Sequence, residues 1–488
     1  MRRSFYISAA VCLLLCISFA LSASARDDPP ILNVFKVKKI KFPSQLYRPW
    51  AIQDIHMLSS KKGIAILEEL VADGSRRLHT LLLKKNGITK LIDTASMEET
   101  IYTLTTSLVW IDGAGAPGAA PAAKGHFLLF LGGSPADEMH STVYMAKLNA
   151  AGKITQQPTK IFEVPCPHEK GEISLYGLGA TRGPASVAVA ATMSIYDGSK
   201  SKSYLEGRFF ETDFEGNLLG TLRDVPFDQK IDQWGGNMRP AWSGKKWLSP
   251  IWAKAKTPGC CRCYIAAAES MVGAAPADIS PIKVSLVFKG GTKDSIEGDS
   301  CFLPDVLVPK TLGGIPAAVK GPNLLLNIST EYEKYKEALS EPVYRSFIQP
   351  FKRQGRKTKQ TTPVPFEAWN IAFQSDQNWK IRRYNEYLSN FLASDSGGYV
   401  VARADSIGRY IPGSAPPEES KFNGRIGLLN VDADFKKVTP ILWQELLNDE
   451  YIDASPVLRR LGDVCWIIVR TKRGIEAQEY FFIATYSL

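Results

Sequence analysis

The sequence predicts an all-β protein made of repeated, four-stranded antiparallel units. Its 488 residues include 10 Trp, 18 Tyr and 38 Gly. Aromatic residues favour strands and glycines favour the tight turns between them, so this composition is typical of a β protein with many short connections. Two periodic features and the two ends of the chain extend the prediction.

A glycine followed by an apolar run recurs seven times along the chain, at intervals of 58 to 77 residues. The clearest copy spans 183–219, where an apolar run, a polar loop, a second run, a turn at 215–217 and a return run follow one another. Seven similar units at such intervals indicate a repeat architecture. The anchoring glycines are Gly63, Gly125, Gly183, Gly244, Gly321, Gly398 and Gly462.

A second marker, an apolar strand with a polar turn and a return strand, follows most of these runs. Its copies lie at 81–92, 143–156, 208–220, 369–381 and 426–439, and the copy at 263–288 has a longer turn. Asn86-Gly87 in the first copy suits a tight hairpin, because both residues tolerate a positive φ. Each unit is therefore predicted to be a four-stranded antiparallel meander.

The two chain ends predict how the repeat closes. The seventh unit ends at Tyr480 to Leu488, with one strand fewer than the other units. Residues 33–42, in which apolar and polar residues alternate, predict an additional strand before the first unit. We expect 33–42 to pair with 479–487, which would close a single seven-bladed β-propeller and leave no exposed sheet edge. Six or eight blades, or two tandem β-sandwiches, are the alternatives.

Three segments interrupt the repeat. Residues 113–123 are rich in Ala, Gly and Pro, and 412–423 form a proline-rich loop. The largest insertion spans about 331–365. Its part 331–354 has helical composition broken by prolines, and a basic tract follows at Lys352, Arg353, Arg356, Lys357 and Lys359.

The first 25 residues have the pattern of a signal peptide. Arg2 and Arg3 precede an apolar core at 9–21, and Ala23-Ser24-Ala25 offers a small-residue cleavage site before Arg26. The sequence thus predicts a secreted or periplasmic propeller domain over 26–488, monomeric and without a transmembrane anchor in the mature chain. The net charge of +10 favours anionic partners weakly, and we expect no nucleic acid partner.

The blade architecture predicts which face carries function. With strands A to D counted outward from the axis, the B–C loops and the D-to-A connections share one face. These loops are longer and chemically richer than the A–B and C–D turns, and long loops on a rigid scaffold are common binding sites. We expect the site among loops near 71–79, 133–142, 163–171, 194–206, 225–240, 254–263, 289–301, 331–365 and 406–425.

Five of the six cysteines beyond the signal segment fall in those loops. In an exported protein, we expect a disulfide among them, first between Cys301 and one of the 260–263 group. The spacing of that group is not that of a zinc site. Cys465 lies in an apolar run and is predicted to be a buried free thiol. The disulfide candidates are Cys166, Cys260, Cys261, Cys263 and Cys301.

The connector 232–242 has the most site-like composition, since it places Trp234, Asn237 and Arg239 around a diglycine. Aromatic faces with an arginine suit sugar rings, carboxylates or phosphates. Arg48 before Trp50 repeats the pattern at the first blade.

Among the histidines, His140 and His168 lie in the predicted functional loops near acidic residues and are candidate ligands or general bases. His56, His79 and His126 lie in or beside strands. There we expect packed or surface imidazoles.

No cofactor and no metal centre are predicted. Calcium is an option at Asp294, Glu297 and Asp299, although their spacing is not that of an EF-hand. The motifs HExxH and GxSxG are absent from the sequence, which argues against the common metalloprotease and α/β-hydrolase classes.

One fragment resembles a motif of a known family. Ser375-Asp376-Gln377-Asn378-Trp379 resembles the Asp box of sialidase-type propellers, with Asn378 in place of the glycine. At the level of the fold, the chain looks like the secreted β-propellers. Because the Asp box is a structural turn in that family, the resemblance implies a fold and no catalytic residue.

Two functional hypotheses follow. The first is an exported scaffold that binds a glycan, an envelope protein or a small anion on its loop-rich face. The second is a hydrolase or lyase acting on an extracellular polysaccharide at the central channel, which would need two close carboxylates if it is a glycosidase.

Overall fold

The computed structural model describes most of the chain from Lys36 to Ser487. All described secondary structure is β. Among these residues, none forms a helix that is long and apolar enough to cross a membrane. The described ranges are 36–112, 125–226, 233–235, 239–244, 246–254, 261–273, 279–289, 301–302, 306–307, 324–331, 344–354, 357–360, 364–365, 380–393, 399–410, 421–431, 438–445, 450–452, 456–473 and 478–487.

The described residues form seven antiparallel sheets, and the first three have four strands each. The first sheet contains β2 (Arg48–Ser59), β3 (Lys62–Leu70), β4 (Arg76–Lys84) and β5 (Thr89–Thr94). The second contains β6 (Thr103–Ile111), β7 (His126–Ser134), β8 (His140–Asn149) and β9 (Ile154–Pro165). The third contains β10 (Gly171–Arg182), β11 (Val187–Asp197), β12 (Lys202–Thr212) and β13 (Leu218–Val225).

The next two sheets have interrupted first strands. The fourth contains β14 (Gln233–Gly235), β15 (Ala241–Trp242), β16 (Lys246–Lys254), β17 (Cys261–Glu269) and β18 (Lys283–Lys289). The fifth contains β19 (Cys301–Phe302), β20 (Val306–Leu307), β21 (Leu324–Glu331), β22 (Tyr344–Gln354), β23 (Lys357–Gln360) and β24 (Val364–Pro365).

The last two sheets complete the ring. The sixth contains β25 (Lys380–Ala393), β26 (Tyr399–Tyr410), β27 (Lys421–Val431) and β28 (Val438–Glu445). The seventh contains β29 (Glu450–Ile452), β30 (Val457–Leu461), β31 (Val464–Arg473), β32 (Gln478–Ser487) and the N-terminal strand β1 (Lys36–Lys39).

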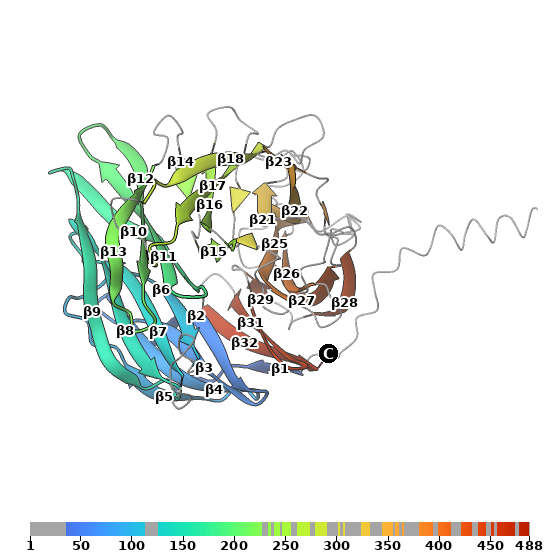
Figure 1. The fold of residues 1–488 in the computed structure, drawn as a ribbon. Helices are drawn as coiled ribbons and strands as arrows, with labels where there is room; N and C mark the ends of the chain where they lie inside the picture. The colour runs from blue at the N-terminus through green and yellow to red at the C-terminus, as the bar shows by residue number, and fades with distance from the viewer. Residues whose placement is uncertain are drawn as a thin grey trace, which may run out of the picture.

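The sheets surround a central axis, and the N-terminal strand closes the ring (Figure 1). β1 pairs with β32 antiparallel, with Lys36 opposite Thr485. The predicted pairing of the two chain ends is therefore confirmed. It removes an exposed edge and ties the last sheet to the first residues of the described chain. This topology is that of a β-propeller.

The anchoring glycines mark the second strand of every sheet. Gly63 lies in β3, and the others come one to four residues before β7, β11, β16, β21, β26 and β31. The described side chains of these strands are mostly buried, for example throughout 64–67, 127–131 and 187–191. Each large apolar cluster joins two neighbouring sheets, as β3 and β7 do in one of them. The repeat in the sequence is therefore the repeat of second strands, which are mostly buried where their side chains are described.

The two short turns expected from the sequence are also present. Gly87 between β4 and β5 has a φ of +79°, and Gly216 between β12 and β13 has a φ of +82°. Both values favour glycine, because a Cβ is strained in this region.

The helix predicted within 331–354 is wrong for its second half. Tyr344–Gln354 is strand β22, paired with β21 on one side and with β23 and β24 on the other. The basic tract continues from β22 into β23 rather than forming a separate insertion. Pairing between two sheet neighbours has overridden a weak helical pattern that Pro350 already interrupted.

Several predicted features lie outside the described residues. They are the loop 113–123, the Asp-box fragment 375–379, the calcium option at 294–299 and most of 412–423.

Candidate functional site in the central channel

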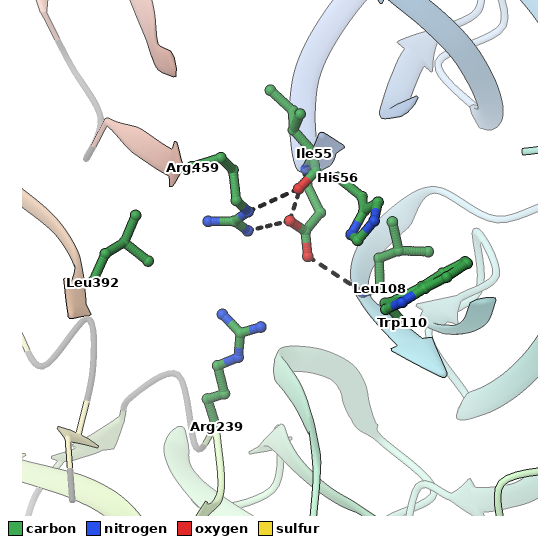
Figure 2. Close-up of a pocket in the computed structure, with 8 residues that line it drawn as sticks. Ile55, His56, Leu108, Trp110, Arg239, Leu392 and Arg459 are labelled. Atoms are coloured by element: carbon green, nitrogen blue, oxygen red, sulfur yellow. Dashed lines mark hydrogen bonds and ion pairs between the residues drawn. The ribbon is translucent and has the colours of Figure 1, made fainter. Parts of the chain in front are cut away.

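A polar pocket lies where the innermost strands of several sheets approach one another. Its volume is about 260 Å³. The lining comes from β2, β6, β25, β30 and the segment before β15, as Figure 2 shows. The described lining residues are Asp54, Ile55, His56, Leu108, Trp110, Arg239, Leu392 and Arg459.

Asp54 is a buried charged group on the inner strand β2. Its side chain is only 8% exposed. One carboxylate oxygen accepts a hydrogen bond from the Ile55 amide at 2.7 Å, and the other accepts one from the Leu108 amide of β6 at 3.4 Å. These bonds offset part of the cost of burying the charge, and they tie the first sheet to the second.

Arg459 on β30 forms an ion pair with Asp54. Its Nε also donates to the Ile55 carbonyl at 2.7 Å, and one terminal nitrogen donates to the Leu458 carbonyl at 2.8 Å. The guanidinium thus bridges the seventh sheet to the first across the point where the ring closes.

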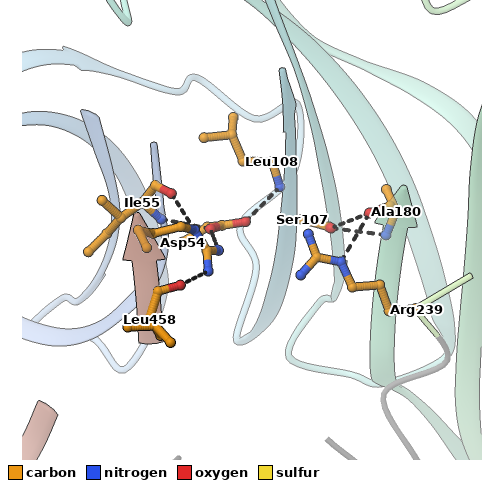
Figure 3. Close-up of polar contacts among 8 residues, drawn as sticks. Asp54, Ile55, Ser107, Leu108, Ala180, Arg239 and Leu458 are labelled. Carbon is orange, nitrogen blue, oxygen red and sulfur yellow. Dashed lines mark hydrogen bonds and ion pairs between the residues drawn. The ribbon is translucent and has the colours of Figure 1, made fainter. Parts of the chain in front are cut away.

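Polar contacts continue around the channel toward Arg239 (Figure 3). The Ser107 hydroxyl of β6 accepts a hydrogen bond from the Ala180 amide of β10 at 2.9 Å. The Ala180 carbonyl in turn accepts from Arg239 Nε at 3.4 Å. Asp54, Arg459, Ser107, Ala180 and Arg239 form a channel belt that joins sheets seven, one, two, three and four.

Gly179 explains how Arg239 comes so close to β10. A Cβ built on Gly179 would lie 2.5 Å from the Arg239 Cα. Only a residue without a side chain allows the two backbones to approach to this distance. The position of Arg239 therefore depends on a glycine one strand away.

His56 and Trp110 form the aromatic side of the pocket. Their rings stack with centroids 5.1 Å apart, and Phe127 packs behind both. Burial lowers the pKa of His56. The Asp54 charge raises it in part, and Arg459 lowers it further. The imidazole is therefore neutral at pH 7, and it offers a hydrogen-bonding group beside an indole ring.

The charges of the pocket are unequal. Among its described lining residues, Asp54 is the single carboxylate, and it is already paired with Arg459. Arg239 turns its guanidinium into the pocket (Figure 2) and has no ion pair with any described residue. One positive charge is thus available for a ligand, beside an aromatic surface.

Of the six binding residues predicted from the sequence, four have described side chains, and among these Arg239 lines the pocket. Asn237 and the side chain of Trp234 lie outside the description. Arg48 is exposed and sits over the Trp50 ring at 5.2 Å, while Arg76 sits over the same ring at 4.5 Å. The pocket lies toward the C-terminal ends of β6 and β25, and among its described lining residues Arg239 alone comes from a loop predicted to carry function, 225–240.

His140 and His168 lie on the predicted loop-rich face, in two separate clusters. His140 Nε2 is 2.8 Å from a Glu99 carboxylate oxygen. His168 Nε2 is 2.8 Å from the Tyr204 hydroxyl, and its Nδ1 is 3.8 Å from Asp197. Hydrogen bonds from Ser199 and Lys200 lower the pKa of Asp197 to about 2.

The cysteine predictions have different outcomes. Cys465 is a buried free thiol as predicted, and burial raises its pKa to about 11. Cys166, a disulfide candidate, is free, and its sulfur lies 3.5 Å from the His168 carbonyl oxygen. The disulfide between Cys301 and the 260–263 group stays a prediction, because those side chains lie outside the description.

The sequence interpretation missed Asp54, His56, Trp110 and Arg459. His56 was expected to be a packed or surface imidazole without a role in a site, and it lines the pocket. One signal was present, because Asp54 and His56 are polar residues at alternate positions of an inner strand. Arg459 carried no such signal, since its partner lies 405 residues away.

Comparison with known proteins gives distant structural similarity. An α-L-arabinanase of Penicillium chrysogenum complexed with arabinobiose has 13% identity and a TM-score of 0.43, over 78% of this chain and 99% of that chain. An α-L-arabinofuranosidase of Fusarium graminearum in complex with arabinobiose has 10% identity and a TM-score of 0.40, over 93% and 98%. The β-propeller domain of a Pyrococcus furiosus protease has 10% identity and a TM-score of 0.34, over 91% and 94%.

No protein-family model matches the chain, and no curated protein matches it. Its class, an all-β propeller closed by the N-terminal strand, rests on its own sheet topology.

Proposed function

We propose that this protein binds a small carboxylate-bearing ligand, such as an acidic sugar, in the central channel. The observation that carries the proposal is Arg239, whose guanidinium faces the pocket without an ion pair among the described residues. A guanidinium binds a carboxylate through two parallel hydrogen bonds, which gives both affinity and orientation.

The remaining lining suits a ring-shaped ligand. Trp110 and His56 present an aromatic side, and Ile55, Leu108 and Leu392 present apolar groups. The volume of about 260 Å³ is close to the lower end for ligand pockets, which favours a ligand of about one sugar unit. A sugar could stack on the aromatic side while its carboxylate meets Arg239.

Binding has more support here than hydrolysis. A glycosidase needs two carboxyl groups roughly 5 to 9.5 Å apart, one of them free to move a proton. The described lining includes only Asp54, and Arg459 engages it. Hydrolysis of an acidic polysaccharide is therefore the second hypothesis.

We also propose that the chain is exported and works in the periplasm or outside the cell. The charged start, the apolar core at 9–21 and the small residues before Arg26 support this. Mass analysis of the protein recovered from the cell envelope or the medium tests it. A mature chain starting at Arg26 is expected, and an uncleaved N-terminus would contradict the proposal.

A titration with matched sugars tests the ligand class. Calorimetry with glucuronate and galacturonate is compared with glucose and galactose, which differ from them mainly in the carboxylate. A glycan array extends the comparison to larger acidic glycans. We expect the acids to bind about tenfold or more tighter, since a hydrogen bond to a charged group contributes about 1.5–3 kcal/mol.

Two arginine variants complete the test. Arg239→Ala should abolish the preference for the acids, and Arg239→Lys should keep part of it. The control is Arg208→Ala, which removes an ion pair with Glu206 far from the channel. Equal affinity for acidic and neutral sugars, or full binding by Arg239→Ala, would contradict the proposal. Release of shorter sugars from an acidic polysaccharide would instead favour hydrolysis.

A further inference from the structure

Three ligating side chains meet at the edge of the second sheet, well away from the channel belt. The His140 Nε2 is 2.8 Å from a Glu99 carboxylate oxygen. One such atom from each of Glu99, His140 and Glu163 lies within 4.8 Å of the other two. We call these three residues the rim cluster.

Three different elements bring the rim cluster together. His140 begins β8, and Glu163 lies near the end of β9, where it is opposite Thr142 in the strand pairing. Glu99 belongs to the connection between β5 and β6, which leads from the first sheet to the second. All three lie on the face of B–C loops and D-to-A connections that the sequence indicated as functional.

We propose that the rim cluster binds a divalent transition metal such as Zn²⁺ or Mn²⁺. One imidazole and two carboxylates form the mixed nitrogen and oxygen set that these ions accept. Ligand atoms about 2.0–2.2 Å from one ion lie roughly 3–3.5 Å apart, so the separations of up to 4.8 Å need only small side-chain rotations. Glu99 and His140 are half-buried and Glu163 is exposed, which leaves a path from solvent.

A buried hydroxyl group beside the rim cluster supports the binding of a hydrated metal ion there. Tyr144 is 0% exposed, and neither its hydroxyl nor that of Thr142 makes a hydrogen bond of normal geometry with any described residue. Alternation along β8 puts His140, Thr142 and Tyr144 on one face of the sheet. Thr142 on that face is opposite Glu163 in the strand pairing, so the face carries both hydroxyl side chains next to the rim cluster. A metal-bound water would give it a partner.

Lys160 is the group that competes with a metal ion. Its Nζ is 2.8 Å from a Glu163 carboxylate oxygen, and both side chains are about 40% exposed, at 40% and 38%. An exposed pair of this kind is weak, so an incoming divalent ion can displace the ammonium group. Removing the lysine should therefore strengthen metal binding.

The experiment uses the mature protein stripped with a chelator and then titrated with Zn²⁺, Mn²⁺ or Ca²⁺ alone. Calorimetry measures the affinity, and the absorption bands of bound Co²⁺ report coordination by an imidazole nitrogen. We expect one Zn²⁺ or Co²⁺ per chain, with binding reduced about tenfold or more in His140→Ala and in Glu99→Gln. Lys160→Met should bind several-fold tighter because a positive charge is removed.

The control is Glu215→Gln in the turn between β12 and β13, which breaks the pair with Lys147 of β8 and should leave metal binding unchanged. Binding that survives in His140→Ala, or that is found for Ca²⁺ only, would overturn the proposal. Arg239→Ala should bind the metal normally, so failure of the sugar proposal and failure of this one are distinguishable.

Discussion

The channel belt and the rim cluster use the same kinds of side chain in opposite settings. In the belt, the Asp54 and Arg459 side chains are 8% and 20% exposed, and they bond to backbone groups of their own strands and of neighbouring strands. In the rim cluster, the His140 and Glu99 side chains are 24% and 33% exposed and come from loops and strand ends. Burial makes the belt part of the fold, whereas exposure leaves the rim free to exchange partners.

The difference follows from where each group sits in a blade. An inner strand faces several other sheets, so its polar side chains can bridge them, and removing one partner leaves the other buried and uncompensated. A strand end on the rim faces water on one side, which screens the same interaction. Ionic groups in this propeller therefore contribute to stability in the channel and to ligand exchange at the rim.

The largest expected effect separates the two regions directly. Asp54→Asn should lower the free energy of unfolding by about 3 kcal/mol, because it removes the carboxylate charge from a mostly buried ion pair with Arg459. Glu163→Gln at the rim, measured with a chelator present, should lower it by less than about 1 kcal/mol. Urea denaturation of both variants measures the difference, and equal losses would refute the contrast.

A smaller effect is expected where the backbones approach in the channel. Gly179→Ala places a methyl group 2.5 Å from the Arg239 Cα, which should cost about 1–3 kcal/mol of stability. It should also weaken the binding of an acidic sugar, because Arg239 must move. Thermal unfolding and calorimetry on the same sample measure the two effects.

Gly244→Ala is the matched control for that variant. Gly244 has a φ of +89° and no atom within 4 Å of the position of a Cβ. The substitution should lower stability through backbone strain alone and leave sugar affinity unchanged. If both variants lose affinity equally, the close approach at Gly179 is not what positions Arg239.

The smallest expected effect is a pH dependence of stability from the channel. Burial holds the pKa of His56 below its usual value of about 6.5. In the pH window between the two values, the unfolded chain binds more protons than the folded one, so stability falls as the pH decreases from about 7 through that window. His56→Gln should flatten this part of the curve of unfolding free energy against pH, and an unchanged slope would exclude His56 as its source.

The sequence predicted the repeat well because the repeat follows from patterns among residues that are close in the sequence. Each anchoring glycine precedes the second strand of a sheet or lies at its start, and alternation in 33–42 identified the closing strand. The helix expected in 331–354 was wrong over β22, because pairing of β22 with β21 and β23 outweighed a weak helical pattern.

The candidate site was predicted less well. Arg239 stood out because tryptophans and glycines surround it, and His140 because acidic residues follow one another near it in the chain. The residues that pair with each other in the two sites lie far apart in the sequence. Glu99 is 41 residues from His140 and Asp54 is 405 residues from Arg459. The residues next to each partner in the sequence do not indicate that such a pair will form.

The sequence by itself determined the class of architecture, the spacing of its units and the way its ends meet. These depend on alternation, turn chemistry and the burial of one strand in four, all of which act over a few neighbouring residues. The tertiary structure alone decided that Asp54, Arg459 and Arg239 share one channel and that Glu99, His140 and Glu163 share one rim. Both groupings arise from the closure of the ring and the packing of one sheet on the next, which bring distant residues together and set the burial of each charge.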